Sequence, residues 1–141
     1  MSDRNSNFIT EFTEVFTRDS GWQTIGEVKN RQHLLVFDEE LKISWLMPTI
    51  IDHYWFKGLV KKIETDSETL FLKPSTEIIV REIATPAKEI KRGDLLTRKN
   101  QWQVAHTITN EGWEGNMYRL FFGEDLVLPI RFGSDYCLLL V

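Results

Sequence analysis

The chain has 141 residues, of which 42% are hydrophobic and 27% charged, and a formal net charge of −4 at pH 7. This composition is typical of a globular domain and excludes a wholly disordered chain, because there is enough apolar surface to bury. The single cysteine, Cys137, cannot form an internal disulfide, which excludes a disulfide-framed secreted fold. We interpret residues 1–141 as a single compact domain.

The apolar runs of the chain give no sign of a secretion signal or a membrane span. The amino-terminal residues do not form a basic segment followed by an apolar one, as a signal peptide would. No stretch reaches the roughly 20 apolar residues that a spanning helix needs. The longest candidate, 46–54, is broken by Pro48 and Asp52. We therefore expect a cytoplasmic protein with no membrane partner.

One stretch near the amino terminus has helical periodicity. Its apolar side chains recur three and four residues apart and would form one stripe on a helix. They are Phe8, Ile9, Phe12, Val15 and Phe16. We predict a short amphipathic helix over residues 6–20, ended by Gly21. Its apolar face would cover the core or, if left open, would pair two copies as a homodimer.

From Gly21 onward the pattern changes to that of short strands. Apolar and polar residues alternate, and turn residues recur at roughly ten-residue spacing. We expect about eight to ten short antiparallel strands. Hairpins are predicted over 33–46, 59–72 and 118–132, a strand over 77–83 and a final strand over 136–141.

These elements predict a mainly β fold with a minor α component, built as a small barrel or sandwich. The two halves of the chain share a loose order of glycine, strand, turn and strand. Two SH3-like or OB-like halves are therefore one arrangement, and one continuous sheet is the other. A proline-containing break marks an internal seam near 84–88. The seam would divide 1–84, the helix and first β unit, from 88–141, the second β unit.

The sequence carries no signature of catalysis, metal binding or cofactor binding. It has no phosphate-binding loop, dinucleotide fingerprint, nucleophile elbow or zinc motif. The three histidines are too far apart for local metal-ligand spacing. We therefore expect no catalytic residues, no metal and no cofactor.

Asp52 and His53 are the one acid–histidine pair of neighbours. Together with Cys137 or Ser44 they could form a nucleophilic site, which makes a small hydrolase one alternative function. Neighbouring residues on a strand point to opposite faces of a sheet, so the two side chains would meet only in a loop.

Aromatic residues give the more informative signal. Tyr54 and Trp55 lie in a stretch with no clear secondary structure, and Trp113 lies in the polar, glycine-rich segment 110–116, which reads as a loop. Tryptophan and tyrosine in such places either pack back onto the core or anchor a partner. We take Trp113, Trp55 and Tyr54 as candidate anchors for a protein partner.

A basic stretch gives the second alternative function. Between residues 88 and 99 the local charge is positive, and a tryptophan follows. Basic and aromatic side chains together suit single-stranded nucleic acid. The candidate residues are Lys91, Arg92, Arg98, Lys99 and Trp102. Our preferred hypothesis from the sequence remains a non-catalytic module that binds a protein partner.

Overall fold

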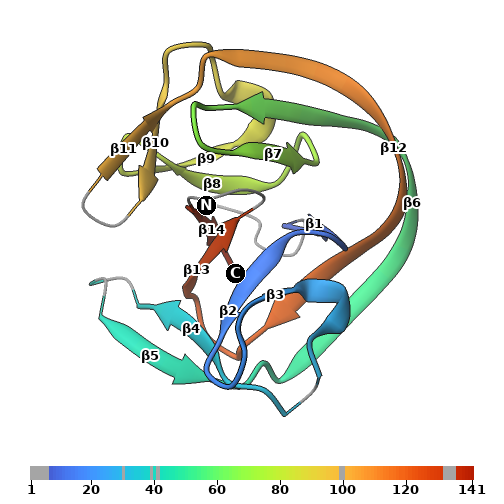
Figure 1. Cartoon of the computed structure of the whole chain (residues 1–141), viewed down its shortest axis with the longest axis vertical. Helices are drawn as coiled ribbons and strands as arrows, with labels where there is room; N and C mark the ends of the chain where they lie inside the picture. Colours follow the sequence, from blue (N-terminus) through green and yellow to red (C-terminus); the bar gives the residue numbers. More distant parts are fainter. Residues whose placement is uncertain (1–6, 30, 39, 41, 99–100, 132–135) are drawn as a thin grey trace.

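The computed structural model (Figure 1) describes residues 7–29, 31–38, 40, 42–98, 101–131 and 136–141. These residues form 14 strands and two 3₁₀ turns, and no α-helix. The strands are β1 (Ile9–Thr10), β2 (Glu14–Thr17), β3 (Gly21–Thr24), β4 (Leu34–Phe37), β5 (Ile43–Leu46), β6 (Ile50–Glu64), β7 (Thr69–Leu72), β8 (Glu77–Val80), β9 (Ile83–Pro86), β10 (Leu95–Arg98), β11 (Gln101–Val104), β12 (Thr107–Phe121), β13 (Val127–Arg131) and β14 (Cys137–Leu140). The 3₁₀ turns are η2 (Ile25–Glu27) and η3 (Ala87–Glu89).

The strands form two antiparallel sheets. In one, β1, β12, β6 and β7 close into a barrel. The other contains ten strands, with the order β11-β10-β8-β14-β13-β2-β4-β5 and with β3 and β9 added beside β2 and β8. The predicted mainly β, antiparallel class is confirmed, but the minor α component is not found in the described residues.

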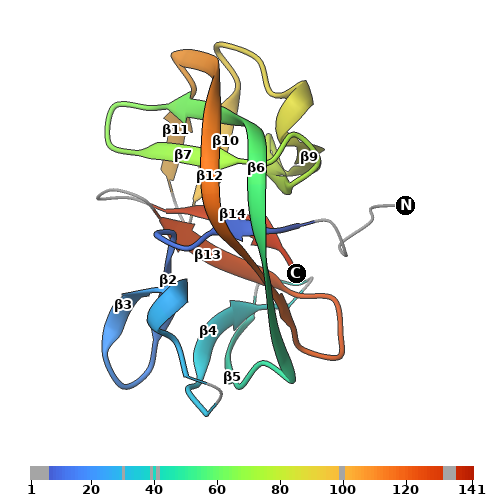
Figure 2. The same ribbon diagram turned by 90° about the vertical axis from the view of Figure 1, so that its right-hand side faces the viewer.

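Two long strands connect the ends of the molecule. β6 and β12 have 15 residues each and pair along their whole length, from Glu64 opposite Thr107 to Ile50 opposite Phe121. Both views show them side by side along one flank, from the region of β7 to the region of β5 (Figures 1 and 2). Together they carry the chain between the two groups of shorter strands.

The amphipathic helix predicted over residues 6–20 is wrong. β1 and β2 occupy this stretch, and Thr13 donates its N–H to the Thr10 carbonyl at 3.0 Å in the turn between them. The hydroxyls of the same two threonines lie 2.9 Å apart and are buried. Phe12, which belongs to the predicted apolar stripe, is 55% exposed. β-branched threonines and the pairing of β1 with β12 and β7 outweigh the helical spacing of the apolar residues.

The local hairpins are predicted better than the distant pairings. Those over 33–46 and 59–72 are confirmed as β4–β5 and β6–β7. The hairpin over 118–132 is wrong, because β12 pairs with β1 and β6 whereas β13 pairs with β14, β2 and β4. The strand predicted over 77–83 ends at Val80. Arg81 and Glu82, with φ of 50° and 67°, then turn the chain into β9.

Two SH3-like or OB-like halves are also not what the chain forms. Strands from the two halves pair with each other, as in β6 with β12 and β8 with β14. The number of short strands expected, eight to ten, is lower than the number in the described residues. The apolar core runs through both halves, with Ile9, Ile63, Leu128 and Leu139 fully buried. In the described residues no helix is long and apolar enough to cross a bilayer.

Candidate functional site

The first described residues lie against the last strand of the chain. The start of β1 and the carboxyl end lie near each other in both views (Figures 1 and 2). The Asn7 side chain, which is 2% exposed, makes the contact: its Nδ2 donates to the Leu140 carbonyl at 2.9 Å. The two residues are 133 positions apart in sequence. Asn7 therefore joins the segment before β1 to the last strand, β14.

The Asn7 amide takes the place of a peptide group between two strands. Its Oδ1 accepts the Glu77 N–H of β8 at 3.0 Å, while its Nδ2 faces β14. The pairing of these strands through Ile78 and Leu139 stops one residue short of this point. A primary amide has the donor and acceptor of a peptide group, so it satisfies both buried backbone groups.

Thr76 holds the carbonyl of Phe8, the residue that follows Asn7. Its Oγ1 donates to the Phe8 carbonyl at 2.9 Å, and the residue is fully buried. Thr76 ends a turn after β7, in which its own N–H donates to the Lys73 carbonyl at 3.0 Å. We name the set Asn7, Phe8, Thr76, Glu77 and Leu140 the junction site. In it, hydrogen bonds hold the carbonyl of Phe8 and the side chain of Asn7 in fixed directions.

Glu77, whose N–H belongs to the junction site, also carries a buried carboxylate. Glu77 is 9% exposed, and its Oε1 is buried with no hydrogen-bond partner among the described residues. Buried polar atoms in proteins are nearly always paired, so this oxygen is unusual among the described residues.

The only cysteine is not set up as a nucleophile. Cys137 of β14 is fully buried. Burial, with a smaller contribution from the Glu68 carboxylate, raises the pKa of its thiol well above the ordinary range. The thiolate is the reactive form of cysteine, so this thiol is inert at neutral pH in the folded chain.

The predicted aromatic anchors all lie on the long strands. The loop expected at 110–116 is wrong, because Trp113 lies in the middle of β12, opposite Gly58. Its ring packs 5.3 Å from that of Phe71 and 6.4 Å from that of Phe12, measured between centroids. Tyr54 and Trp55 lie on β6 and are 36% and 61% exposed. Trp113 is therefore packed against other rings, whereas Trp55 is exposed.

Asp52 and His53 do not form a dyad. They are adjacent on β6, so their side chains leave opposite faces. The Asp52 carboxylate accepts from the Arg119 guanidinium at 3.2 Å, whereas the His53 ring packs against the Tyr118 ring with centroids 5.4 Å apart. In the described residues, no group of three or more His, Cys, Asp and Glu side chains could hold a metal.

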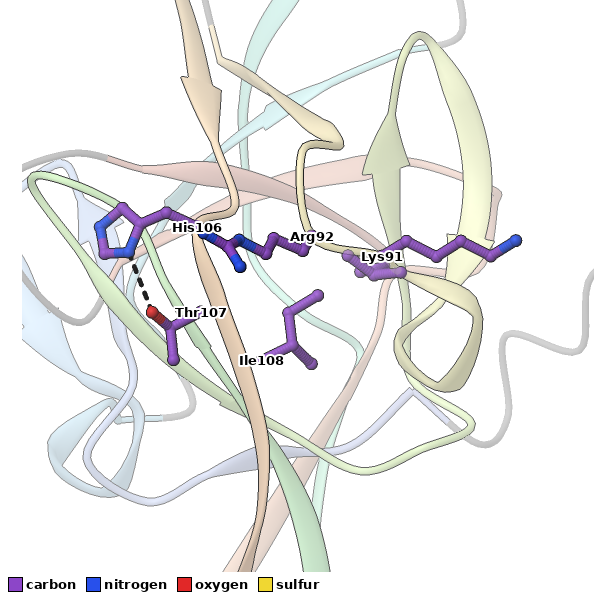
Figure 3. A pocket seen from close by; sticks show the side chains of 6 residues that line it. Lys91, Arg92, His106, Thr107 and Ile108 are labelled. Carbon is purple, nitrogen blue, oxygen red and sulfur yellow. Dashed lines mark hydrogen bonds between the residues drawn. The ribbon is translucent and has the colours of Figure 1, made fainter.

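Of the predicted basic patch, the structure describes the side chains of Lys91 and Arg92. Lys91 and Arg92 line an open hollow together with His106, and their side chains extend in opposite directions (Figure 3). His106 lies 3.4 Å from the Asp66 carboxylate and 3.1 Å from the Thr107 hydroxyl. Lys99 and the side chains of Arg98 and Trp102 lie outside the described residues, although β10 and β11 carry the latter two.

Comparison with known proteins relates the chain to one group of folds. Neither a family model nor a curated protein sequence matches it. The bacterial intein-like domain from Clostridium thermocellum matches with a TM-score of 0.78, over 94% of this chain and 97% of that chain, at 13% identity. The TvoVMA intein matches with a TM-score of 0.73, over 96% and 98%, at 12% identity.

A third similar structure is the AceL NrdHF class 3 split intein. It matches with a TM-score of 0.67, over 91% of this chain and 99% of that chain, at 14% identity. It is a splice-inactive variant in which one cysteine and one asparagine are replaced by alanine. At these identities the likeness establishes the fold alone, and that fold is intein-like.

This finding overturns the function expected from the sequence. Inteins are protein-splicing domains, which process their own polypeptide chain, and this is a catalytic role. The expectation of a non-catalytic module that only binds a partner is therefore wrong, and so is the expectation that the chain is no enzyme. The nucleic-acid barrel and the small hydrolase are set aside on the same ground.

No residue of the junction site is predicted from the sequence. Phe8 falls on the apolar stripe of the predicted helix, and Thr76 lies at a predicted break between two strands. No local motif connects Asn7 with Glu77 and Leu140, because the three are brought together by strand pairing alone. No local signal in the sequence distinguishes Asn7, since a second asparagine, Asn5, lies two residues earlier.

Proposed function

We propose that this chain is a self-processing domain that acts on its own peptide bond between Asn7 and Phe8. The observation that carries the proposal is a set of hydrogen bonds on either side of that bond, within an intein-like fold. The Asn7 side chain is held by Glu77 and Leu140, and the Phe8 carbonyl is held by Thr76. The Asn7–Leu140 hydrogen bond holds the residue before the proposed cleavage point against β14.

The reaction that we propose is an intramolecular acyl transfer. The Asn7 side-chain nitrogen attacks the carbonyl carbon of its own residue and forms a five-membered cyclic imide. The C–N bond to Phe8 breaks, and the proton lost by the side-chain nitrogen passes to the Phe8 nitrogen, which leaves as a free amine. The products are residues 1–7, ending in the imide, and residues 8–141. No water or other co-reactant is consumed.

Two neighbours of Asn7 support this chemistry. The Leu140 carbonyl and the Glu77 N–H fix the side-chain amide at both ends, so that its conformational freedom is lost before reaction. Glu77 also supplies a buried carboxylate oxygen without a hydrogen-bond partner among the described residues. We assign it the role of carrying the proton from Asn7 to the leaving nitrogen.

The test is a time course of intact-mass spectrometry on the purified full chain. We expect two products whose masses sum to that of the intact chain, and Asn7→Ala should abolish them. Asn110→Ala, at an exposed position on β12, is the matched control and should cleave like the wild type. Because the imide itself adds one water when it hydrolyses, products heavier by one water would overturn the role of Asn7 as nucleophile only where Asn7→Ala forms them too. A folded wild-type chain that stays intact would overturn the proposed function.

A further inference from the structure

Two cations and one aromatic side chain contact the ring of Phe8. The Lys73 Nζ lies 5.2 Å from the centroid of the Phe8 ring, and the Arg119 Cζ lies 4.7 Å from it. The Tyr54 ring meets the Phe8 ring edge to face at 4.7 Å. These residues come from β12, from β6 and from the turn after β7, so three parts of the barrel converge on one side chain.

The cations themselves are held in place. Lys73 donates to the Tyr54 hydroxyl at 2.7 Å and also lies 5.3 Å and 5.4 Å from the ring centroids of Tyr54 and Phe56. In the described residues no carboxylate pairs with it, so aromatic faces stabilise its charge. Arg119 is fixed by the Asp52 carboxylate at 3.2 Å and lies 4.5 Å from the Phe121 ring.

This arrangement concerns the same residue whose carbonyl accepts the Thr76 hydroxyl. Phe8 is held both at its carbonyl and at its ring, so it has little rotational freedom. The Asn7–Phe8 peptide bond, which precedes it, is restricted for the same reason. We infer that Phe8, Lys73 and Arg119 form a ring clamp that positions the Asn7–Phe8 bond, and that an aromatic residue at position 8 is a specificity requirement of the site.

The effect of the ring clamp on cleavage rests on the proposed function, but its effect on the position of Asn7 can be measured separately. The Glu77 N–H donates to Asn7 Oδ1, so the hydrogen-exchange rate of the Glu77 amide reports how often Asn7 leaves its place. Phe8→Leu removes the ring, whereas Phe8→Tyr keeps an aromatic face. Phe12→Leu makes the same chemical change at an exposed ring four residues further on, and is the matched control.

We expect Phe8→Leu and Lys73→Met to speed exchange of the Glu77 amide by about five- to thirtyfold, the effect of losing one or two cation–π contacts. Phe8→Tyr and Phe12→Leu should change it less than about twofold. Exchange of the Leu128 amide, in the core strand β13, should be unchanged in each variant, which shows that the opening is local.

The cleavage rate of the same variants should follow the same order. If Phe8→Leu exchanges and cleaves like the wild type, the ring clamp is overturned while the proposed function stands. If the wild type does not cleave at all, the proposed function fails. The hydrogen-exchange rate of the Glu77 amide then tests the ring clamp alone. Faster exchange in Phe8→Leu than in the wild type supports the ring clamp, and unchanged exchange overturns it.

Discussion

Asn7→Ala is expected to destabilise the fold strongly for a residue that lies outside the strands. The substitution removes the partners of the Glu77 N–H and the Leu140 carbonyl, which are both buried. A buried backbone group left without a hydrogen bond costs about 1–3 kcal/mol. Two such groups give about 2–4 kcal/mol once some water has entered. For a chain of this size the melting temperature would fall by roughly 6–12 °C.

Urea unfolding followed by tryptophan fluorescence measures this loss, with Asn110→Ala as the control. That variant removes an exposed amide from β12 and should stay within about 0.5 kcal/mol of the wild type. Asn7→Asp separates the two hydrogen bonds, because it keeps the acceptor for the Glu77 N–H and loses the donor to the Leu140 carbonyl. An Asn7→Ala variant as stable as its control would refute the role of Asn7 as the bridge between the segment before β1 and β14.

Three further predictions follow from single contacts. Trp113→Ala should lower the free energy of unfolding, measured in urea, by about 2–4 kcal/mol, since the Trp113 ring is packed. Trp55→Ala should lower it by less than about 1 kcal/mol, because Trp55 is exposed. Equal effects of the two substitutions would contradict this difference in packing. Thr76→Val should cost about 1 kcal/mol in the same assay through the lost bond to the Phe8 carbonyl, and no change would count against that bond. Burial raises the pKa of the Cys137 thiol, so the stability it contributes is present below the unfolded pKa and falls as pH rises from about 8.5 toward the folded pKa. Stability measurements on Cys137→Ala, which should lack this alkaline loss, check the sign, and an unchanged alkaline slope would contradict it.

The parts of the fold that sequence reasoning predicted are those set by neighbours in the chain. The hairpins β4–β5 and β6–β7 have short turns and alternating side chains, so their pairing follows from local pattern. The helix predicted over residues 6–20 is wrong because apolar spacing near 3.6 also fits two short strands joined by a turn. Only the pairing of Ile9 with Tyr118 and Leu72 distinguishes them.

The segment around Trp113 shows why long-range pairing escaped prediction. Gly112 and Gly115 made it look like a loop, but in β12 these glycines lie opposite Leu59 and Phe56, and Trp113 lies opposite Gly58. Large side chains that cover glycines across a ladder stabilise a strand, and this complementarity is visible only once the partner strand is known. The junction site depends on the same kind of distant pairing.

The most direct test of the proposed self-processing is amino-terminal sequencing of the shorter species formed when the folded chain is incubated. We expect a new chain that begins at Phe8, formed by the wild type and by Asn110→Ala and absent from Asn7→Ala. A wild-type chain that keeps its original amino terminus throughout, or one that is cut at another bond, would contradict it.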